Sequence, residues 1–339
     1  MNAQPRVGIF SSSPKSRWRC ILMVVVLGVL SAVPSLAQTT DTGEHIYRLG
    51  SPSTFQRGCF APCLCPVMQS GSEEGTFVLT AAGTDGLFNK YVVSEVNWIV
   101  ALPSGETVRV TGSGSFKVGG EFAVQQQLSL DLKVGNDPVE HFDSGLVAGG
   151  GDFPRIDITI SIHGQYCYDT VFHMEAAPVP PEEIHPYRLL PDSTFQQGCS
   201  GPCACAPGAQ RPVRGGFTLV ELGNDPLFTR FAVVLVKWLV APDPTSATST
   251  STPITGAGSY RVGGEVAVEQ QMALDLKVGT LSPAIFDSGL VPGGQNFPRI
   301  DIRMTSGAGS CVTTTIDLHA KPARLSTTSA APTLEDPAF

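Results

Sequence analysis

The sequence predicts an all-β protein of two tandem antiparallel β-sandwich domains, related by internal duplication and each holding two disulfides. Three observations support this fold class. Several five-residue motifs occur twice, apolar and polar residues alternate with a period of two, and each copy contains four cysteines. No segment shows helical periodicity, and alternation with one polar face is typical of antiparallel sheets.

Residues 1–37 have the three parts of a secretory signal peptide. Four basic residues precede an apolar run at 20–33, and Ser35-Leu36-Ala37 supplies a cleavage site of small residues. The apolar run is too short for a membrane span, which needs about 20 residues. The mature chain is therefore expected to be secreted, periplasmic or on the cell surface, with no membrane span after cleavage.

The charge of the mature chain limits its partners. Removal of the leader leaves 18 basic and 30 acidic residues, a net charge of −12. A chain of that charge lacks the basic surface that binds nucleic acid.

The repeat fixes the expected domain boundaries. His45–Leu49 resembles His185–Leu189 at an offset of 140, and Asp131–Gly135 recurs as Asp275–Gly279 at an offset of 144. These matches predict domains at 45–177 and 185–323, a Pro/Glu linker at 178–184, and a disordered tail at 324–339 that is rich in Ser, Thr, Ala and Pro.

Alternation predicts the strands. From Phe122 to Val134 the even-numbered residues are apolar except Gln126, which predicts one long strand with a buried face. Gly119-Gly120 before it suggests a two-residue hairpin. Residues 156–162 alternate in the same way, and Trp98 and Trp238 lie in apolar strands and are expected in the cores.

The cysteines form two matching sets. An even number per domain in an exported chain predicts two disulfides each, and zinc binding is disfavoured because the spacing lacks two C-x2-C-type pairs. In the first copy, either Cys59 pairs with Cys63 and Cys65 with Cys167, or Cys59 pairs with Cys65 and Cys63 with Cys167. The eight residues are Cys59, Cys63, Cys65, Cys167, Cys199, Cys203, Cys205 and Cys311.

Two groups of residues suggest catalysis and are better explained as structure. His141, Asp143 and Ser144 could suggest a catalytic triad, but triad members usually come from separate segments, and Asp-Ser-Gly is typical of a turn. Asp131 and Asp157 could form a glycosidase pair if their strands were neighbours, although an exposed ladder of alternating charges is favoured.

Two pairs of residues are weak candidates for metal binding. His173 and Glu175 share a strand face, as do Asp317 and His319 in the second copy. No third ligand is suggested by the spacing, so solvated strand residues are favoured.

The sequence thus favours an exported binding or structural protein without enzymatic activity. A carboxylate-based extracellular hydrolase acting on carbohydrate and a metal-binding module are the alternatives. No cofactor is expected, and the partner is unknown, with an envelope protein and a polysaccharide as the candidates.

Overall fold

The computed structural model describes residues 43–63, 65–199, 208–244, 249–307 and 311–323. The predicted signal peptide at 1–37 and the predicted tail at 324–339 lie outside these residues and stay predictions. Within the described ranges, no helix has the length and hydropathy that crossing a membrane requires.

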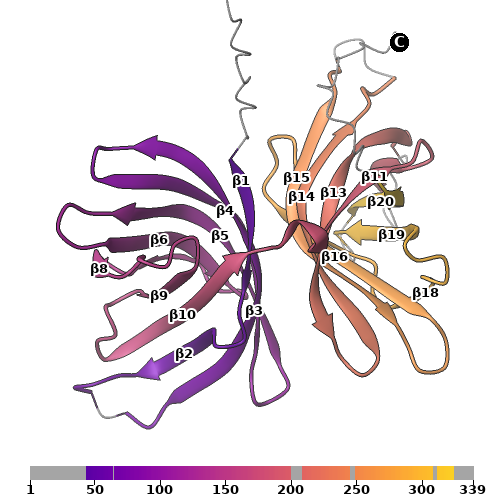
Figure 1. Ribbon diagram of the computed structural model, residues 1–339. Coiled ribbons are helices and arrows are strands. Elements are labelled where there is room, and N and C mark those ends of the chain that lie inside the picture. The colour runs from indigo at the N-terminus through magenta and orange to yellow at the C-terminus, as the bar shows by residue number, and fades with distance from the viewer. Residues whose placement is uncertain (1–42, 64, 200–207, 245–248, 308–310, 324–339) are drawn as a thin grey trace, which may run out of the picture. The chain divides into compact units, whose positions relative to one another are not determined.

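Residues 44–178 form one antiparallel sheet of ten strands (Figure 1). The strands are β1 (Glu44–Leu49), β2 (Thr54–Cys59), β3 (Met68–Thr84), β4 (Phe88–Ala101), β5 (Thr107–Gly119), β6 (Gln125–Val134), β7 (Val139–Asp143), β8 (Val147–Ala148), β9 (Ile156–Ser161) and β10 (Tyr168–Pro178).

Residues 184–322 form a second sheet of ten strands after a single turn of 3-10 helix, η1 (Pro181–Glu183). The strands are β11 (Ile184–Leu189), β12 (Thr194–Cys199), β13 (Arg211–Asn224), β14 (Phe228–Val240), β15 (Thr252–Gly263), β16 (Glu269–Val278), β17 (Ala284–Asp287), β18 (Val291–Pro292), β19 (Ile300–Ser306) and β20 (Val312–Pro322).

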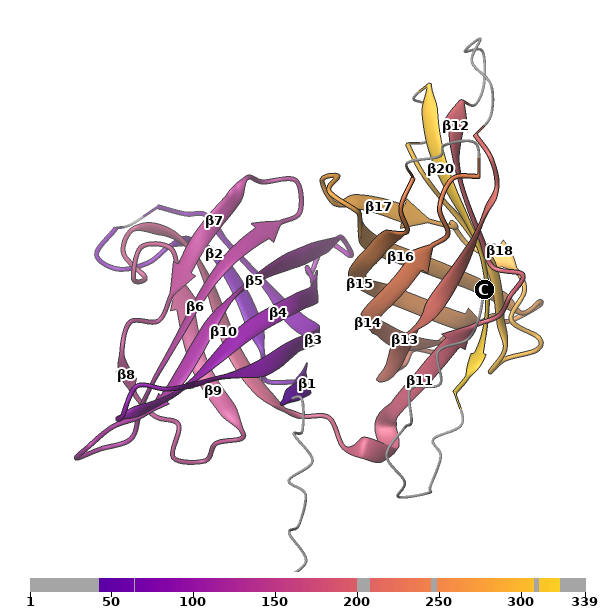
Figure 2. The same cartoon turned by 90° about the horizontal axis from the view of Figure 1, so that it is seen from above.

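Each sheet closes on itself, because its first two strands pair with strands from both of its ends. In residues 44–178, β1 and β2 follow each other along one line and pair with β3 on one side and β10 on the other. β10 also pairs with β9, and β9 meets β7. Residues 184–322 repeat this pattern, and in both views of Figures 1 and 2 each set of strands curves around its own interior.

The predicted all-β, antiparallel character is confirmed. The arrangement is sandwich-like, but the strands of each copy belong to one continuous sheet and not to two separate sheets. The two ends are bridged by β1 and β2 in the first copy and by β11 and β12 in the second. We call residues 45–177 repeat 1 and residues 185–323 repeat 2. Each contains one of the two sheets, while the division into two domains stays a prediction.

Each sheet encloses an apolar core in which aromatic side chains meet. In repeat 1, Trp98 contacts Phe77 and Phe172 with ring centroids 6.3 and 5.7 Å apart, and Trp238 of repeat 2 contacts Phe217 at 6.2 Å. Both tryptophans are buried, as predicted. Such aromatic contacts stabilise a core beyond the area that they bury.

A buried carboxyl group departs from this pattern. Glu73 on β3 lies in the interior of repeat 1, and neither carboxyl oxygen has a hydrogen-bond partner among the described residues. Burial raises the pKa of this carboxyl well above its ordinary range. The equivalent residue of repeat 2 is the core residue Val213.

The predicted strand at 122–134 is three residues too long at its start. β6 begins at Gln125, and Phe122 lies in the β5–β6 turn with 96% of its surface exposed. The expected two-residue hairpin is also wrong, because Gly119 pairs with Gln125 and residues 120–124 connect the strands. Alternation continues through Phe122 in the sequence, but the β5–β6 ladder stops before it.

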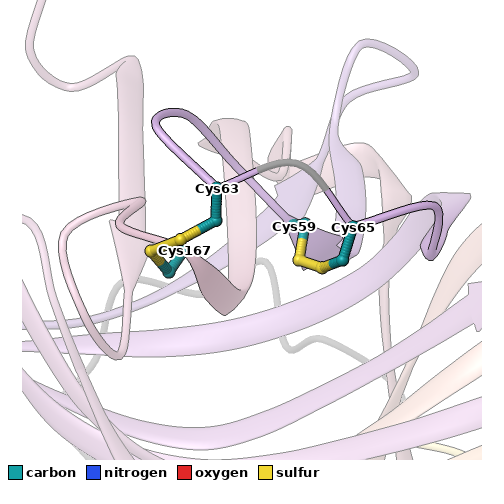
Figure 3. Close-up of a disulfide and its surroundings, with 4 residues drawn as sticks. All are labelled: Cys59, Cys63, Cys65 and Cys167. Carbon is teal, nitrogen blue, oxygen red and sulfur yellow. A yellow bond between two sulfur atoms is a disulfide. The ribbon is translucent and has the colours of Figure 1, made fainter.

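The structure selects one of the two open disulfide pairings in repeat 1. Cys59 is bonded to Cys65 and Cys63 to Cys167, with Cα–Cα distances of 5.7 and 4.8 Å (Figure 3). In repeat 2, Cys199 and Cys311 each take part in a disulfide. Cys203 and Cys205 lie outside the described residues, so two matching bonds in repeat 2 stay a prediction.

Candidate functional site

The closed sheet of repeat 1 has a seam between β8 and β9. β9 shares a single register pair with β7, between Ser161 and Asp143, while β8 pairs with β6. Within the described part of repeat 1, residues 156–160 therefore have a strand neighbour only on the β10 side. The turn at Asp143-Ser144-Gly145 causes the seam, because it turns the chain away from β9 before β8 begins.

A cleft of about 980 Å³ lies at this seam. It is lined by the end of β1, by β8 and the glycine-rich connection that follows, and by parts of β9 and β10. Clefts of this size accommodate small ligands. Five charged residues of both signs line it, namely Arg48, Asp152, Arg155, Asp157 and Glu175.

Gln126 connects the two sides of the seam from the interior. This β6 residue is 2% exposed, and its Nε2 donates to the carbonyl oxygen of Asp157 at 2.6 Å. Its Oε1, however, has no hydrogen-bond partner among the described residues. A buried acceptor without a donor costs about 1–3 kcal/mol, so the cleft contains one unsatisfied polar group.

The glycines of the β8–β9 connection lie directly against Gln126. A Cβ atom at Gly149 would be 2.5 Å from Gln126 Nε2, and one at Gly150 would be 2.5 Å from Val118 Cγ2. Both positions also have positive φ, 143° and 84°, which L-residues rarely adopt. At Gly151, by contrast, a Cβ would meet no atom within 4 Å.

The outer wall of the cleft contains two carboxylates on neighbouring strands. Asp157 on β9 is in register with Glu175 on β10, and His173 lies beside both. The Asp157 side chain is 74% exposed. A carboxyl that acts as general acid at neutral pH is usually kept protonated by an apolar environment, and Asp157 has no such environment.

A buried aspartate holds the loop beside the cleft. The Asp169 carboxylate accepts hydrogen bonds from the backbone N–H groups of Ile162, His163, Gln165 and Thr170. Gln165 also lines the cleft. A carboxylate with several N–H donors fixes such a loop strongly, so this wall of the cleft is preorganised.

The same seam in repeat 2 differs in its side chains. Gln270 donates to the carbonyl oxygen of Asp301 at 2.7 Å, as Gln126 does in repeat 1, but its Oε1 accepts from Tyr260 at 3.0 Å. Position 116, equivalent to Tyr260, is a phenylalanine. The absence of one hydroxyl thus explains why Gln126 Oε1 lacks a donor.

The carboxylate of Asp301 is also engaged within repeat 2. Arg299 Nε donates to it at 2.8 Å, and His319 Nδ1 lies 2.7 Å from it. These two hydrogen bonds, with that of Arg299 the stronger, lower the pKa of Asp301 below its ordinary range. Asp157, the equivalent residue, lies no closer than 3.9 Å to His173.

The two catalytic groupings that the sequence disfavoured are not assembled in the structure. Asp143 and Ser144 form the expected turn, in which Gly145 N–H donates to Asp143. Asp131 lies opposite His141 on β7 and not beside Asp157, because β7 separates β6 from β9. Asp131 and Asp157, a pairing that the sequence disfavoured, therefore do not lie side by side.

The structure instead forms a Ser-His-Asp chain across β6 and β7 that sequence reasoning missed. Ser129 Oγ lies 3.2 Å from His141 Nε2, and His141 Nδ1 lies 2.8 Å from Asp131 Oδ1. The His141 and Asp131 side chains are more than 60% exposed on the outer sheet face. The backbone N–H groups of Ser129 and Asp131 belong to β6, which pairs with β5 on one side and with β7 on the other, so these groups are not available as an oxyanion hole.

The candidate metal ligands lie near carboxylates, but in an unsuitable arrangement. His173 has Asp157 3.9 Å from Nδ1 and Glu175 3.9 Å from Nε2. His319 is likewise placed between Asp301 and Asp317. When one carboxylate lies beside each ring nitrogen, the two carboxylates and the imidazole cannot all bind the same metal ion. The described residues also contain no group of three or more ligands that could hold a metal.

Comparisons with known proteins give no relative from which a function could be transferred. No protein-family model matches the chain, and no curated protein and no solved structure matches it significantly. The site must therefore be interpreted from its own chemistry.

Proposed function

We propose that this chain is an exported, non-enzymatic binding protein whose ligand occupies the seam cleft of repeat 1. The observation that carries the proposal is that Gln126, a cleft-lining residue, has a buried Oε1 without a partner among the described residues, while Gln270 in repeat 2 has one. Buried polar groups in folded proteins are almost always satisfied. A ligand that supplies a hydrogen-bond donor would satisfy this one.

The leader and the cysteines support an extracytoplasmic location. Disulfides persist in oxidising compartments, and Cys59–Cys65 and Cys63–Cys167 are compatible with the periplasm, the cell surface or the extracellular space. We further propose that repeat 2 has the same two pairings and that each repeat is a separate domain. In such a location the chain would meet envelope polysaccharides and envelope proteins, which are the two candidate classes of partner.

Hydrolysis is the second candidate, because Asp157 and Glu175 line the same cleft. The exposure of Asp157 argues against it, as a hydrolase of this class needs one carboxyl in an apolar environment. Binding and hydrolysis differ in one measurable result. A binding protein retains its ligand stoichiometrically, whereas a hydrolase releases cleaved product.

The test blocks the cleft with one side chain. Gly151→Trp introduces an indole where a Cβ meets no atom and no positive φ opposes it, and repeat 2 has Gln295 at the same position. The purified chain and the variant are titrated with soluble glycans and synthetic peptides while cleavage is monitored. We expect retention without cleavage by the parent chain and at least a tenfold loss of affinity in the variant.

The matched control is Gln295→Trp, the same indole in repeat 2. It should leave binding unchanged, because the cleft lies in repeat 1. Cleavage without retention, or retention that Gly151→Trp leaves unaltered, would contradict the proposed function.

A further inference from the structure

The charged residues of the cleft limit which ligands it suits. Asp157 and Glu175 provide acceptors on one wall, and Arg155 provides guanidinium donors beside them. The other lining arginine, Arg48, is engaged by Glu183 and by the carbonyl oxygen of Glu221. The cleft therefore carries charges of both signs, Asp152 included, and neutral hydroxyls can both donate to its carboxylates and accept from its guanidinium group.

Gln126 adds a requirement for a donor. Its Nε2 is committed to the carbonyl oxygen of Asp157, so the amide is oriented with Oε1 as the group left for a ligand. The close fit of Gly149 and Gly150 against the amide prevents it from rotating freely. A fixed, desolvated acceptor discriminates strongly against ligands that cannot donate.

We infer that the ligand is a neutral saccharide, with one hydroxyl donating to Gln126 Oε1, directly or through one water, and others meeting Asp157, Glu175 and Arg155. This inference rests on the proposed function and deepens it by naming the ligand class. Gln126 is then the specificity-determining residue of the cleft. Repeat 2 has the same backbone seam but supplies the donor from its own Tyr260.

The experiment supplies that donor internally in repeat 1. Phe116→Tyr copies repeat 2, where the hydroxyl at the equivalent position reaches the glutamine Oε1 at 3.0 Å. The variant should unfold at a higher temperature than the parent chain, because an unsatisfied acceptor gains a partner. Its affinity for neutral oligosaccharides, measured by titration calorimetry, should fall about tenfold, since the acceptor is no longer available.

Tyr260→Phe is the matched control. It removes the internal donor from Gln270 and should lower stability while leaving saccharide affinity unchanged. The probes are neutral oligosaccharides of glucose, mannose and N-acetylglucosamine, a glucosamine oligosaccharide that carries amines, and an Arg/Lys-rich peptide.

The outcomes separate this inference from the proposed function. Binding of the peptide or of the amine-bearing oligosaccharide in place of the neutral saccharides, abolished by Gly151→Trp, would overturn the saccharide assignment and leave the cleft as the binding site. Saccharide binding that is sensitive to Gly151→Trp but indifferent to a stabilising Phe116→Tyr would overturn the role of Gln126. Binding that no cleft substitution affects would overturn both.

Discussion

The seam of repeat 2 resembles that of repeat 1 in its backbone and differs in how its polar groups are satisfied. In repeat 2, Tyr260 donates to Gln270, and Arg299 and His319 hold the carboxylate of Asp301. In repeat 1, the equivalents of these residues leave Gln126 Oε1 without a partner and Asp157 largely exposed. A duplicated fold thus contains one seam closed by its own side chains and one that leaves groups for a ligand.

The second difference between the repeats lies in the interiors. Position 73 is a buried glutamate without partners in repeat 1, while repeat 2 has Val213 in its core. Both differences place an unsatisfied polar group in repeat 1. Stability and binding measurements on the two repeats therefore test the comparison directly.

The largest expected effect concerns the long-range disulfide of repeat 1. Replacing Cys63 and Cys167 by serine opens a loop of 104 residues and should cost about 5 kcal/mol by the chain-entropy model. Opening the 6-residue loop of Cys59 and Cys65 should cost about 2 kcal/mol. Denaturant unfolding followed by Trp98 fluorescence in a Trp238→Phe background measures both. Equal losses would contradict the loop-length argument.

The next effect tests the buried glutamate. Glu73→Val, which copies repeat 2, should raise the free energy of unfolding by about 1–3 kcal/mol at neutral pH. The sign follows from the raised pKa of Glu73. The folded state holds this proton more tightly than the unfolded state does, so the contribution of Glu73 to stability is highest at low pH and falls as pH rises above 4.5.

The pH series provides the control for this substitution. The advantage of Glu73→Val should grow as pH rises from about 4, while Val213→Ile in repeat 2 should show no such trend. A variant that is less stable at every pH would show that the carboxylate is accommodated by the folded state.

A smaller effect concerns Tyr260. Tyr260→Phe removes the donor to Gln270 and makes the repeat 2 seam resemble that of repeat 1. It should destabilise repeat 2 by about 1–2 kcal/mol, because the buried amide oxygen loses its partner. Thermal unfolding monitored through Trp238 is the measurement. An unchanged midpoint would mean that water replaces the hydroxyl in the seam.

The smallest effect is expected at the β5–β6 turn. Phe122 and its equivalent Val266 are 96% and 98% exposed, so serine at either position should change stability by less than about 0.5 kcal/mol. Phe116→Ala, six residues earlier on β5, should cost about 3–5 kcal/mol because that ring is buried. A large loss at Phe122 would support the longer strand that alternation suggested.

The candidate site was only partly visible in the sequence. Gln126 stood out as the single polar residue on an apolar strand face, and the change from Phe116 to Tyr260 can be found by aligning the repeats. Neither observation shows that the glutamine reaches across to β9. The contact between Ser129 and His141 was also hidden, because it depends on which residues of β6 and β7 lie opposite each other.

The sequence by itself determined the duplication, the antiparallel β class, the buried tryptophans and the sorting of cysteines into two sets. These features follow from local alternation and from spacing along the chain. Only the tertiary structure decided that β1 and β2 close the first sheet and β11 and β12 the second, that Cys63 pairs with Cys167, and that Gln126 lines a cleft without a donor to its Oε1. These features depend on strand order and register, which residue periodicity does not encode.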